Sequence, residues 1–297
     1  MIHPLSIDQL SMARSLFERL TQRQPMCTAV LEGIYPGKVY VDNPSEPRTA
    51  LLTTSIESEA NGVWCFLAGS PANSDLNQAV NNGIFSRQLI AEGVPVLFFT
   101  CDPDDWGGQM DRIFAPRPPI WFERNHFIGR QVCFNWRAAV PPDFSVERIS
   151  SDLRQLPGLH LPEDIAATLS KWEQITDTRF SDFGFATLDR TGPQPVIASW
   201  ATIDFIAAGA GDLGFFTQPD YRRRSLGTIA VSAALEYGFA SGLQRVHWTC
   251  DAGNPGSIRT AEKLGLERIE DYHQAVLIMD EERHMAFFQK EPSNSTA

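Results

Sequence analysis

The chain has 297 residues, 43% of them hydrophobic, and a formal net charge of −11 at pH 7. That length and apolar content permit one large or two moderate globular domains with buried cores. The acidic balance argues against a nucleic-acid partner, and no apolar run approaches membrane-spanning length. Five cysteines without a C-x-x-C pair indicate reduced, buried thiols rather than a disulfide framework or a zinc site. Because the N-terminus has no basic region followed by an apolar core, we expect a cytoplasmic protein.

The first part of the chain reads as two helices followed by strands. Ser6 and Gln9 form a capping-box pattern, and apolar residues then recur at helical spacing as far as Leu20. A second, short helix fits residues 27–33. Turn-rich segments separate three strand patterns, which predict an antiparallel meander over residues 38–42, 48–55 and 63–69.

The next segment alternates polar and apolar runs. Residues 74–92 are polar and interrupted by Gly83, so we expect two short helices, followed by a buried strand over residues 94–100. Three aspartates follow that strand: Asp102, Asp104 and Asp105. Such a cluster can bind a divalent cation, but a solvated turn that caps a helix near Trp106 explains it better.

Residues 117–136 are rich in proline and aromatic side chains. They suit either a wall of a ligand cleft or, as the better interpretation, ordinary core. The paired prolines within residues 138–142 predict a domain boundary. The expected domains are therefore residues 1–138 and 139–297.

The second half begins with a strand, two helices and two further strands. Their expected ranges are 144–149, 150–155, 162–172, 183–188 and 196–205.

A strand, a cationic turn and a helix start then follow without interruption in residues 211–227, GDLGFFTQPDYRRRSLG. Backbone N–H groups at such a helix start lack intrahelical partners, and the helix dipole adds positive charge. Arg222, Arg223 and Arg224 add three full charges there. This junction is therefore typical of a phosphate-binding site.

A helix with one apolar face follows the turn, and Gly242 suits its C-terminal cap. Residues 245–250, RVHWTC, have the pattern of an interior strand. Asn254 before Pro255 predicts the start of a second helix, which Gly265 closes. The order is strand, helix, strand, helix.

These residues carry a resemblance. YRRRSLGT, HWTC and NPGSIRTAEKLGL resemble the cofactor-binding half of the GNAT superfamily of acyl-CoA N-acyltransferases, over about residues 143–280. The resemblance implies an α/β (α+β) fold with a mixed, largely antiparallel sheet flanked by helices. More loosely, AVLEGIYPGKVYVDNPSEPRTALL and WCFLAG resemble the GNAT subgroup that includes the zwittermicin A resistance acetyltransferases. That subgroup implies a GNAT-like N-terminal half, which we do not expect to bind cofactor.

The resemblance also implies acetyl-CoA as acyl donor. In the family motif Arg/Gln-x-x-Gly-x-Gly/Ala, Arg222 takes the first position and Gly227 the last, while Ser225 replaces the first glycine. Serine is tolerable there if its φ angle is ordinary. The strand before the turn would supply backbone donors for the pantetheine and the thioester. The implied cofactor contacts are Phe215, Phe216, Thr217, Arg222, Arg223, Arg224, Ser225, Leu226, Gly227, Thr228, Asn254, Ser257 and Lys263.

The usual catalytic tyrosine of the family falls on Ala261, so the proton donor must differ. As the general base, Asp212 stands where relatives often carry a glutamate on the strand, although it also suits a solvent-facing strand start. His247 could relay a proton, but a core histidine is the simpler interpretation. Tyr272 could donate the proton to the leaving thiolate, but it also suits a packed strand position.

The leading hypothesis is an acetyl-CoA-dependent N-acetyltransferase acting on a small-molecule amine, without a metal, and a homodimer is left open. The alternative is a CoA-responsive binding or regulatory protein that kept the cofactor cleft but lost catalysis, which Ala261 would permit. A nucleotide-binding doubly wound domain fits less well, because the turn lacks a glycine-rich fingerprint.

Overall fold

The computed structural model describes residues 2–55, 62–173 and 183–289. The chain forms two compact units, each discontinuous in sequence. Unit 1 comprises Met1–Gln22, Val30–Glu123 and His273–Ala297, and unit 2 comprises Arg23–Ala29 and Arg124–Tyr272. This division differs from the expected cut at 138/139, because the chain enters and leaves unit 2 within two long strands, β6 (Ile120–Gly129) and β12 (Glu267–Ile278).

Unit 1 is a sheet with helices. Its strands are β1 (His3–Pro4), β2 (Gly37–Val41), β3 (Thr49–Thr54), β4 (Gly62–Gly69), β5 (Val96–Asp102) and the end of β12, in the order β1-β2-β3-β4-β5-β12. Its helices are η1 (Ile7–Phe17), α1 (Glu18–Arg23), α3 (Ser74–Phe85), α4 (Trp106–Ile113) and α9 (Glu281–Gln289). The last residue of α1 and most of α2 (Pro25–Leu31) belong to unit 2.

The sequence predicted most of these elements. The antiparallel pairing of β2, β3 and β4 confirms the meander, and the Ser6–Gln9 capping box is present, although the helix after it begins as a 3₁₀ helix. The expected break at Gly83 is wrong, because α3 runs through that residue. A Cβ at Gly83 would lie 2.6 Å from the Leu89 side chain. The glycine therefore serves close packing.

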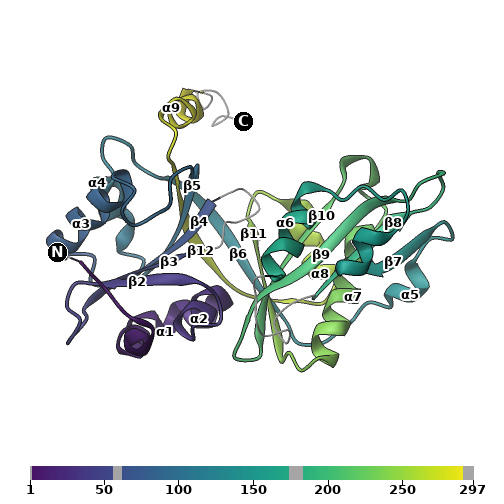
Figure 1. Cartoon of the computed structure of the whole chain (residues 1–297), viewed down its shortest axis with the longest axis horizontal. Helices are drawn as coiled ribbons and strands as arrows, with labels where there is room; N and C mark the ends of the chain where they lie inside the picture. The colour runs from purple at the N-terminus through teal and green to yellow at the C-terminus, as the bar shows by residue number, and fades with distance from the viewer. Residues whose placement is uncertain (1, 56–61, 174–182, 290–297) are drawn as a thin grey trace. The chain divides into compact units, whose positions relative to one another are not determined.

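Unit 2 is a larger layered unit of the mixed α/β type. Its strands are β7 (Phe144–Arg148), β8 (Gly184–Asp189), β9 (Val196–Ala207), β10 (Ala210–Thr217), β11 (Arg245–Asp251) and the end of β6, in the order β6-β11-β10-β9-β8-β7. Its helices are α5 (Trp136–Ala139), η2 (Ser151–Gln155), α6 (Glu163–Trp172), η4 (Pro219–Tyr221), α7 (Leu226–Ala240) and α8 (Pro255–Lys263). Helix α7 packs against β8, β9 and β10 (Figure 1).

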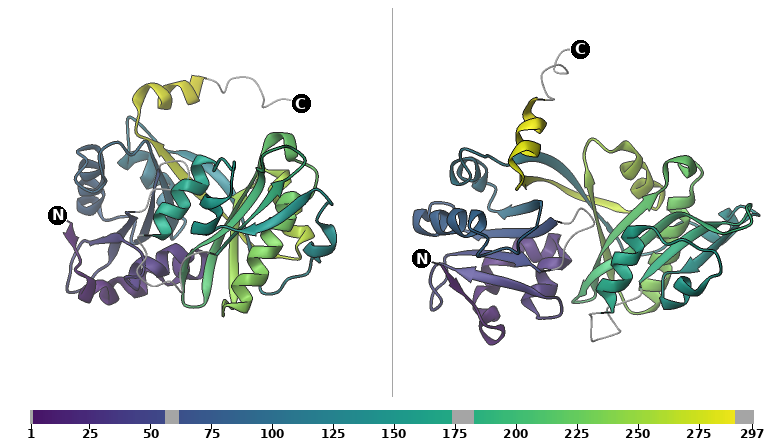
Figure 2. Two further views of the ribbon diagram at one scale, coloured as in Figure 1. Left: turned by 45° about the vertical axis from the view of Figure 1, so that its right-hand side comes forward. Right: turned by 45° about the horizontal axis from the view of Figure 1, so that its top comes forward.

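The two halves of the sequence exchange their last strands. Strand β6, from the first half, pairs antiparallel with β11, whereas β12, from the second half, pairs antiparallel with β5. Figure 2 shows β6 and β12 side by side in both views, as the strand order requires. Neither unit therefore has a complete sheet without a strand from the other half of the sequence.

The units share an internal repeat. Thr100-Cys101-Asp102 ends β5, and the same tripeptide, Thr249-Cys250-Asp251, ends β11. Each of these strands has a parallel neighbour on one side and an antiparallel exchanged strand on the other. The repeat gives β5 and β11 a common register, which allows the units to be compared residue by residue.

The remaining expectations concern the aspartate cluster, the aromatic segment, the cysteines and membrane-spanning helices. Asp102 forms an ion pair with Arg19 at 3.0 Å, and no cluster of three metal-binding side chains occurs within the described ranges. Phe127 is buried in the core of unit 2. All five cysteines are free, but Cys133 is exposed rather than buried. Across the described part of the chain, none of the helices is long and apolar enough to cross a membrane.

Candidate functional site

Strands β10 and β11 separate after a short parallel contact. Ala210, Gly211 and Asp212 pair with Arg245, Val246 and His247, and the register then gives no further pairs between these described strands. β10 itself continues to Thr217 along β9. One edge of β10 beyond Asp212 therefore faces β11 without a ladder, and some of its backbone N–H groups are available to a ligand.

Unit 1 lacks this separation. The equivalent parallel pair, β4 and β5, keeps its register over seven residue pairs, from Gly62↔Val96 to Ala68↔Asp102. By the shared register, Trp64 and Phe98 occupy the positions of Asp212 and His247, and their rings stack at 4.9 Å. The opening between parallel strands is thus a feature of unit 2.

The separated edge of β10 leads to the N-terminus of α7. The first intrahelical backbone bond runs from Ile229 N to Ser225 O, so the N–H groups of Leu226, Gly227 and Thr228 precede the ladder. Ser225 makes no side-chain cap, and its φ of +61° is left-handed. Serine was expected to be tolerable at this glycine position if its φ angle was ordinary, and the φ angle is not ordinary. Its Oγ instead accepts a 2.9 Å bond from Lys263 Nζ on α8.

The three arginines of the turn do not all point the same way. Arg222 Nε donates to the carbonyl of Thr217 at 3.2 Å, and Arg224 lies over the rings of Phe144 and Tyr221. Arg223 is exposed and has a left-handed φ of +63°. They keep the turn electropositive, although each occupies a different part of its surface.

Several implied cofactor residues have packing roles in the structure. A Cβ at Gly227 would lie 2.7 Å from Thr217 Oγ1 and 3.0 Å from the Phe215 ring, so this glycine allows α7 to approach β10. The Asn254 side chain caps α8 through Ser257 N. Phe216 is exposed and packs against Trp200 with tilted rings, 4.9 Å between centroids. These residues therefore fix how α7 packs on β10 and where α8 begins.

The catalytic candidates lie on one face of the unit 2 sheet, here called the polar face. Val246, Trp248 and Cys250 pack into the core with α7 and α8, so the intervening His247 and Thr249 point to the opposite side. Asp212 is the register partner of His247 and shares that side. Asp212 and His247 therefore meet where the strands separate.

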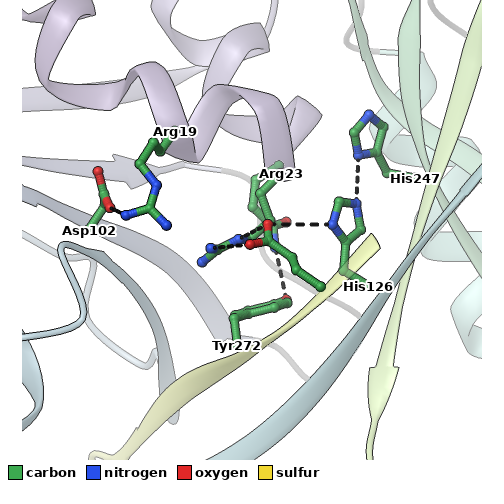
Figure 3. Close-up of polar contacts among 8 residues, drawn as sticks. Arg19, Arg23, Asp102, His126, His247 and Tyr272 are labelled. Atoms are coloured by element: carbon green, nitrogen blue, oxygen red, sulfur yellow. Dashed lines mark hydrogen bonds and ion pairs between the residues drawn. The ribbon is translucent and has the colours of Figure 1, made fainter. Parts of the chain in front are cut away.

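His247 belongs to a buried chain of polar groups. Arg245 Nε donates to His247 Nε2 at 3.2 Å, and His247 Nδ1 lies 3.0 Å from His126 Nε2 (Figure 3). An arginine side chain can only donate hydrogen bonds, so His247 Nε2 must be the acceptor of this one. We therefore infer that the proton of the neutral His247 ring is on Nδ1. His126 Nδ1 then faces Glu270 Oε1 at 3.8 Å. Burial lowers the pKa of His126 to about 4 and that of His247 to about 3, so both rings are neutral at pH 7.

Tyr272 lies in the same cluster. Gln24 Nε2 donates to its hydroxyl at 2.9 Å, and the guanidinium of Arg23 lies 4.8 Å from its ring centroid (Figure 3). Arg23 also holds Glu270 with two bonds of 2.7 and 3.0 Å. Burial raises the pKa of Tyr272, and the nearby charge of Asp212 acts in the same direction. The structure thus brings Asp212, His247 and Tyr272 together, whereas Ala261 is buried in the core.

Sequence reasoning missed four members of this cluster: Arg23, Gln24, His126 and Glu270. His126 lies on β6, which strand exchange pairs with β11, and Glu270 lies on β12. Arg23 and Gln24 come from the end of α1 and the residue after it. The repeated Thr-Cys-Asp tripeptide was the signal that could have revealed the relation between β5 and β11. It also missed Asp204, the β9 register partner of Asp212, whose carboxylate accepts from Trp172 Nε1 at 2.9 Å and from Thr202 Oγ1 at 3.1 Å.

The comparisons with known proteins identify the family of the chain and solved structures with a similar fold. The GNAT acetyltransferase family model matches residues 14–274. The chain belongs to that family. A GCN5-related N-acetyltransferase-like protein from Streptococcus suis 89/1591 is 20% identical, with a TM-score of 0.65 over 91% of this chain and 98% of its own. No curated protein matches.

Two further GNAT structures share the fold. A GCN5-related N-acetyltransferase from Sphaerobacter thermophilus is 11% identical, with a TM-score of 0.60 over 94% of this chain and 95% of its own. A tandem GNAT protein from the clavulanic acid biosynthesis pathway is 13% identical, with a TM-score of 0.59 over 94% and 98%. At these identities the likeness shows the fold alone.

Proposed function

We propose that the chain transfers the acetyl group of acetyl-CoA to the amine of a small molecule. The observation that carries this proposal is the separation of β10 from β11 after Asp212, which continues into the uncapped N-terminus of α7. An extended pantetheine can bind the backbone of β10, while the pyrophosphate binds the first N–H groups of α7. Membership of the GNAT acetyltransferase family supports acetyl transfer generally.

One donor site per chain follows from the contrast between the units. The parallel pair in unit 1 has no opening, and a Trp64–Phe98 stack stands where unit 2 has Asp212 and His247. Unit 1 accordingly serves a structural purpose in this account. The absence of an opening between β4 and β5 is the reason that we do not place a cofactor site in the N-terminal half.

The reaction requires a neutral amine that attacks the thioester carbonyl. The new C–N bond forms, the C–S bond breaks, the amine loses a proton and the CoA thiolate gains one. Asp212 is the proposed base, directly or through a water molecule, because both nitrogens of neutral His247 face other side chains. Tyr272 keeps its proton at neutral pH and is a proposed donor to the thiolate.

The experiment is a thiol-release assay with acetyl-CoA and a panel of primary amines, with the acetylated product identified by mass. The alternative, a CoA-responsive regulatory protein, is favoured by the buried Ala261 at the position of the family tyrosine. Thiol release that depends on an amine supports the enzyme. Tight acetyl-CoA binding without thiol release in the presence of any of the amines supports the regulatory protein. Membership of the zwittermicin-type subgroup stays a prediction.

A further inference from the structure

Arg124 is a cation of the polar face that the proposed proton chemistry does not use. It lies two residues before His126 on β6, and it is the register partner of Asp251 on β11. Its Nη2 reaches Thr249 Oγ1 at 3.5 Å, which places the guanidinium over β11 on the side of His247. Its charge also lowers the pKa of Tyr272, against the raising effect of burial.

The hydrogen-bond donors of Arg124 are poorly used. Its Nε is buried without a partner, and the long contact with Thr249 is its one hydrogen bond among the residues that the structure describes. Arg23, on the same face, is by contrast held by both oxygens of Glu270. A guanidinium partly removed from water is costly unless an anion pairs with it. Arg124 therefore presents a fork of donors suited to an anion from outside the chain.

A second buried donor points into the same cluster without a partner. His126 Nδ1 is buried and has no hydrogen-bond partner, with Glu270 Oε1 at 3.8 Å. His126 is 1% exposed. Two unpartnered donors, from Arg124 and His126, thus lie two residues apart on the same face of β6. Buried polar atoms are normally hydrogen-bonded, so buried donors without a protein partner indicate a site for a polar ligand.

The spacing along β11 limits the distance between the anion and the amine of the ligand. Thr249 lies two residues beyond His247, which is about 6.6 Å along a strand. Asp212, where the amine would react, is beside His247. An anion at Arg124 and an amine at Asp212 can therefore belong to one small molecule, with one to a few carbons between the two groups and hydrogen-bond lengths at each end.

We propose that Arg124 binds the carboxylate of the acceptor, so that the acceptors are small amino acids: α-amino acids or their short β and γ homologues. This inference rests on the proposed acetyl transfer to an amine. The planar fork of Arg124 fits a carboxylate, while Asp212 and Asp204 favour the ammonium end of the same molecule. Arg124 is a specificity-determining residue in this arrangement, and it takes no part in the proton transfers.

The test compares matched acceptors. L-Phenylalanine, β-alanine and 4-aminobutyrate are assayed against their primary amides and against the amines that lack the carboxylate. The full-length wild-type chain should favour the carboxylates in kcat/KM. Arg124→Gln should lower that value about 10- to 100-fold for the carboxylates and little for the amides, which corresponds to one charge-assisted pair. Arg130→Gln, which removes an exposed charge from the residue directly after the same strand, is the control.

Two results would overturn the inference: a wild-type enzyme that acetylates amides and simple amines as well as the amino acids, or an Arg124→Gln variant that keeps the preference. If that variant fails to fold, Arg124→Lys replaces it, because lysine keeps the charge but loses the planar pair of donors. Arg124→Lys should also lose the preference for carboxylates, and an unchanged preference would overturn the inference. If no amine is acetylated, the proposed function fails by itself. Calorimetry of the same amino acids with CoA present, on wild type and variant, then decides whether Arg124 binds carboxylates.

Discussion

Lys263 Nζ donates a 2.9 Å hydrogen bond to Ser225 Oγ and so joins the end of α8 to the start of α7. Ser225 makes this contact from a left-handed backbone conformation, with φ at +61°. An L-residue other than glycine is strained there by about 1–2 kcal/mol. The link between the helices is therefore made at a cost in backbone energy, and it lies at the proposed pyrophosphate site.

Ser225→Gly should raise the free energy of unfolding by about 0.5–1 kcal/mol. Relief of the backbone strain outweighs the lost contact with Lys263, because exposed polar pairs contribute little. Urea unfolding of the wild type, Ser225→Gly and Lys263→Met measures both effects. A clear loss of stability in Ser225→Gly, with Lys263→Met equally unstable, would show that the hydrogen bond matters more than the strain.

Gly227→Ala should destabilise unit 2 by about 1–3 kcal/mol, since a Cβ would meet Thr217 and Phe215 side chains. The same change should weaken acetyl-CoA binding, because it pushes α7 away from β10. Thermal unfolding and calorimetry on one preparation separate the two effects. Unchanged stability and unchanged affinity together would remove Gly227 from both roles. Gly107→Ala, at a position with open space around its Cβ, is the matched control.

Asp212→Asn should lower turnover about 10²- to 10⁴-fold, chiefly at the acidic end of the pH profile, where the amine is mostly protonated. Acetyl-CoA affinity should stay close to that of the wild type. Asp143→Asn, at an exposed position, is the control. If Asp212→Asn keeps wild-type turnover across the profile while His247→Ala abolishes it, the base belongs on β11.

The histidine pair should make stability depend on pH. His126 and His247 have folded-state pKa values of about 4 and about 3, below the ordinary value of 6.5. The unfolded chain then binds more protons as pH falls below about 6.5, so their contribution to stability is present above that pH and is lost toward pH 4. We expect a loss on the order of 3 kcal/mol for each ring over that interval, so about 6 kcal/mol for the pair.

The double variant His126→Asn/His247→Asn removes both titrating rings and should flatten this part of the pH profile of the free energy of unfolding. His160→Asn, a histidine outside the cluster, should leave the profile as it is. An unchanged slope in the double variant would mean that other groups cause the acid sensitivity.

A fragment that begins near Pro142 should be inactive. It lacks β6, which pairs with Val246–Asp251 of β11, and it lacks Arg23 and His126. The exposed edge of β11 would also favour aggregation. Activity of the soluble fragment on the same amine as the full chain measures this. Full activity would show that neither β6 nor the N-terminal segment is needed for the site.

The sequence allowed the local elements of the second half and the cationic turn to be predicted, because hydrophobic periodicity, Asn254 and the glycines are local signals. It did not reveal the exchange of β6 and β12, since pairing across more than a hundred residues leaves no periodic trace. His126 and Glu270 were missed for the same reason. The strain at Ser225 was missed because φ depends on how α7 meets β10.

The central claim is that acetyl-CoA binds once per chain, between the separated strands and the start of α7. A calorimetric titration of the full-length chain with acetyl-CoA tests it most directly, with wild type compared to Arg222→Gln and to Arg112→Gln on α4 of unit 1. We predict one acetyl-CoA per chain, weakened by Arg222→Gln and unaffected by Arg112→Gln. Two acetyl-CoA molecules per chain, or the same affinity in wild type and Arg222→Gln, would contradict the account.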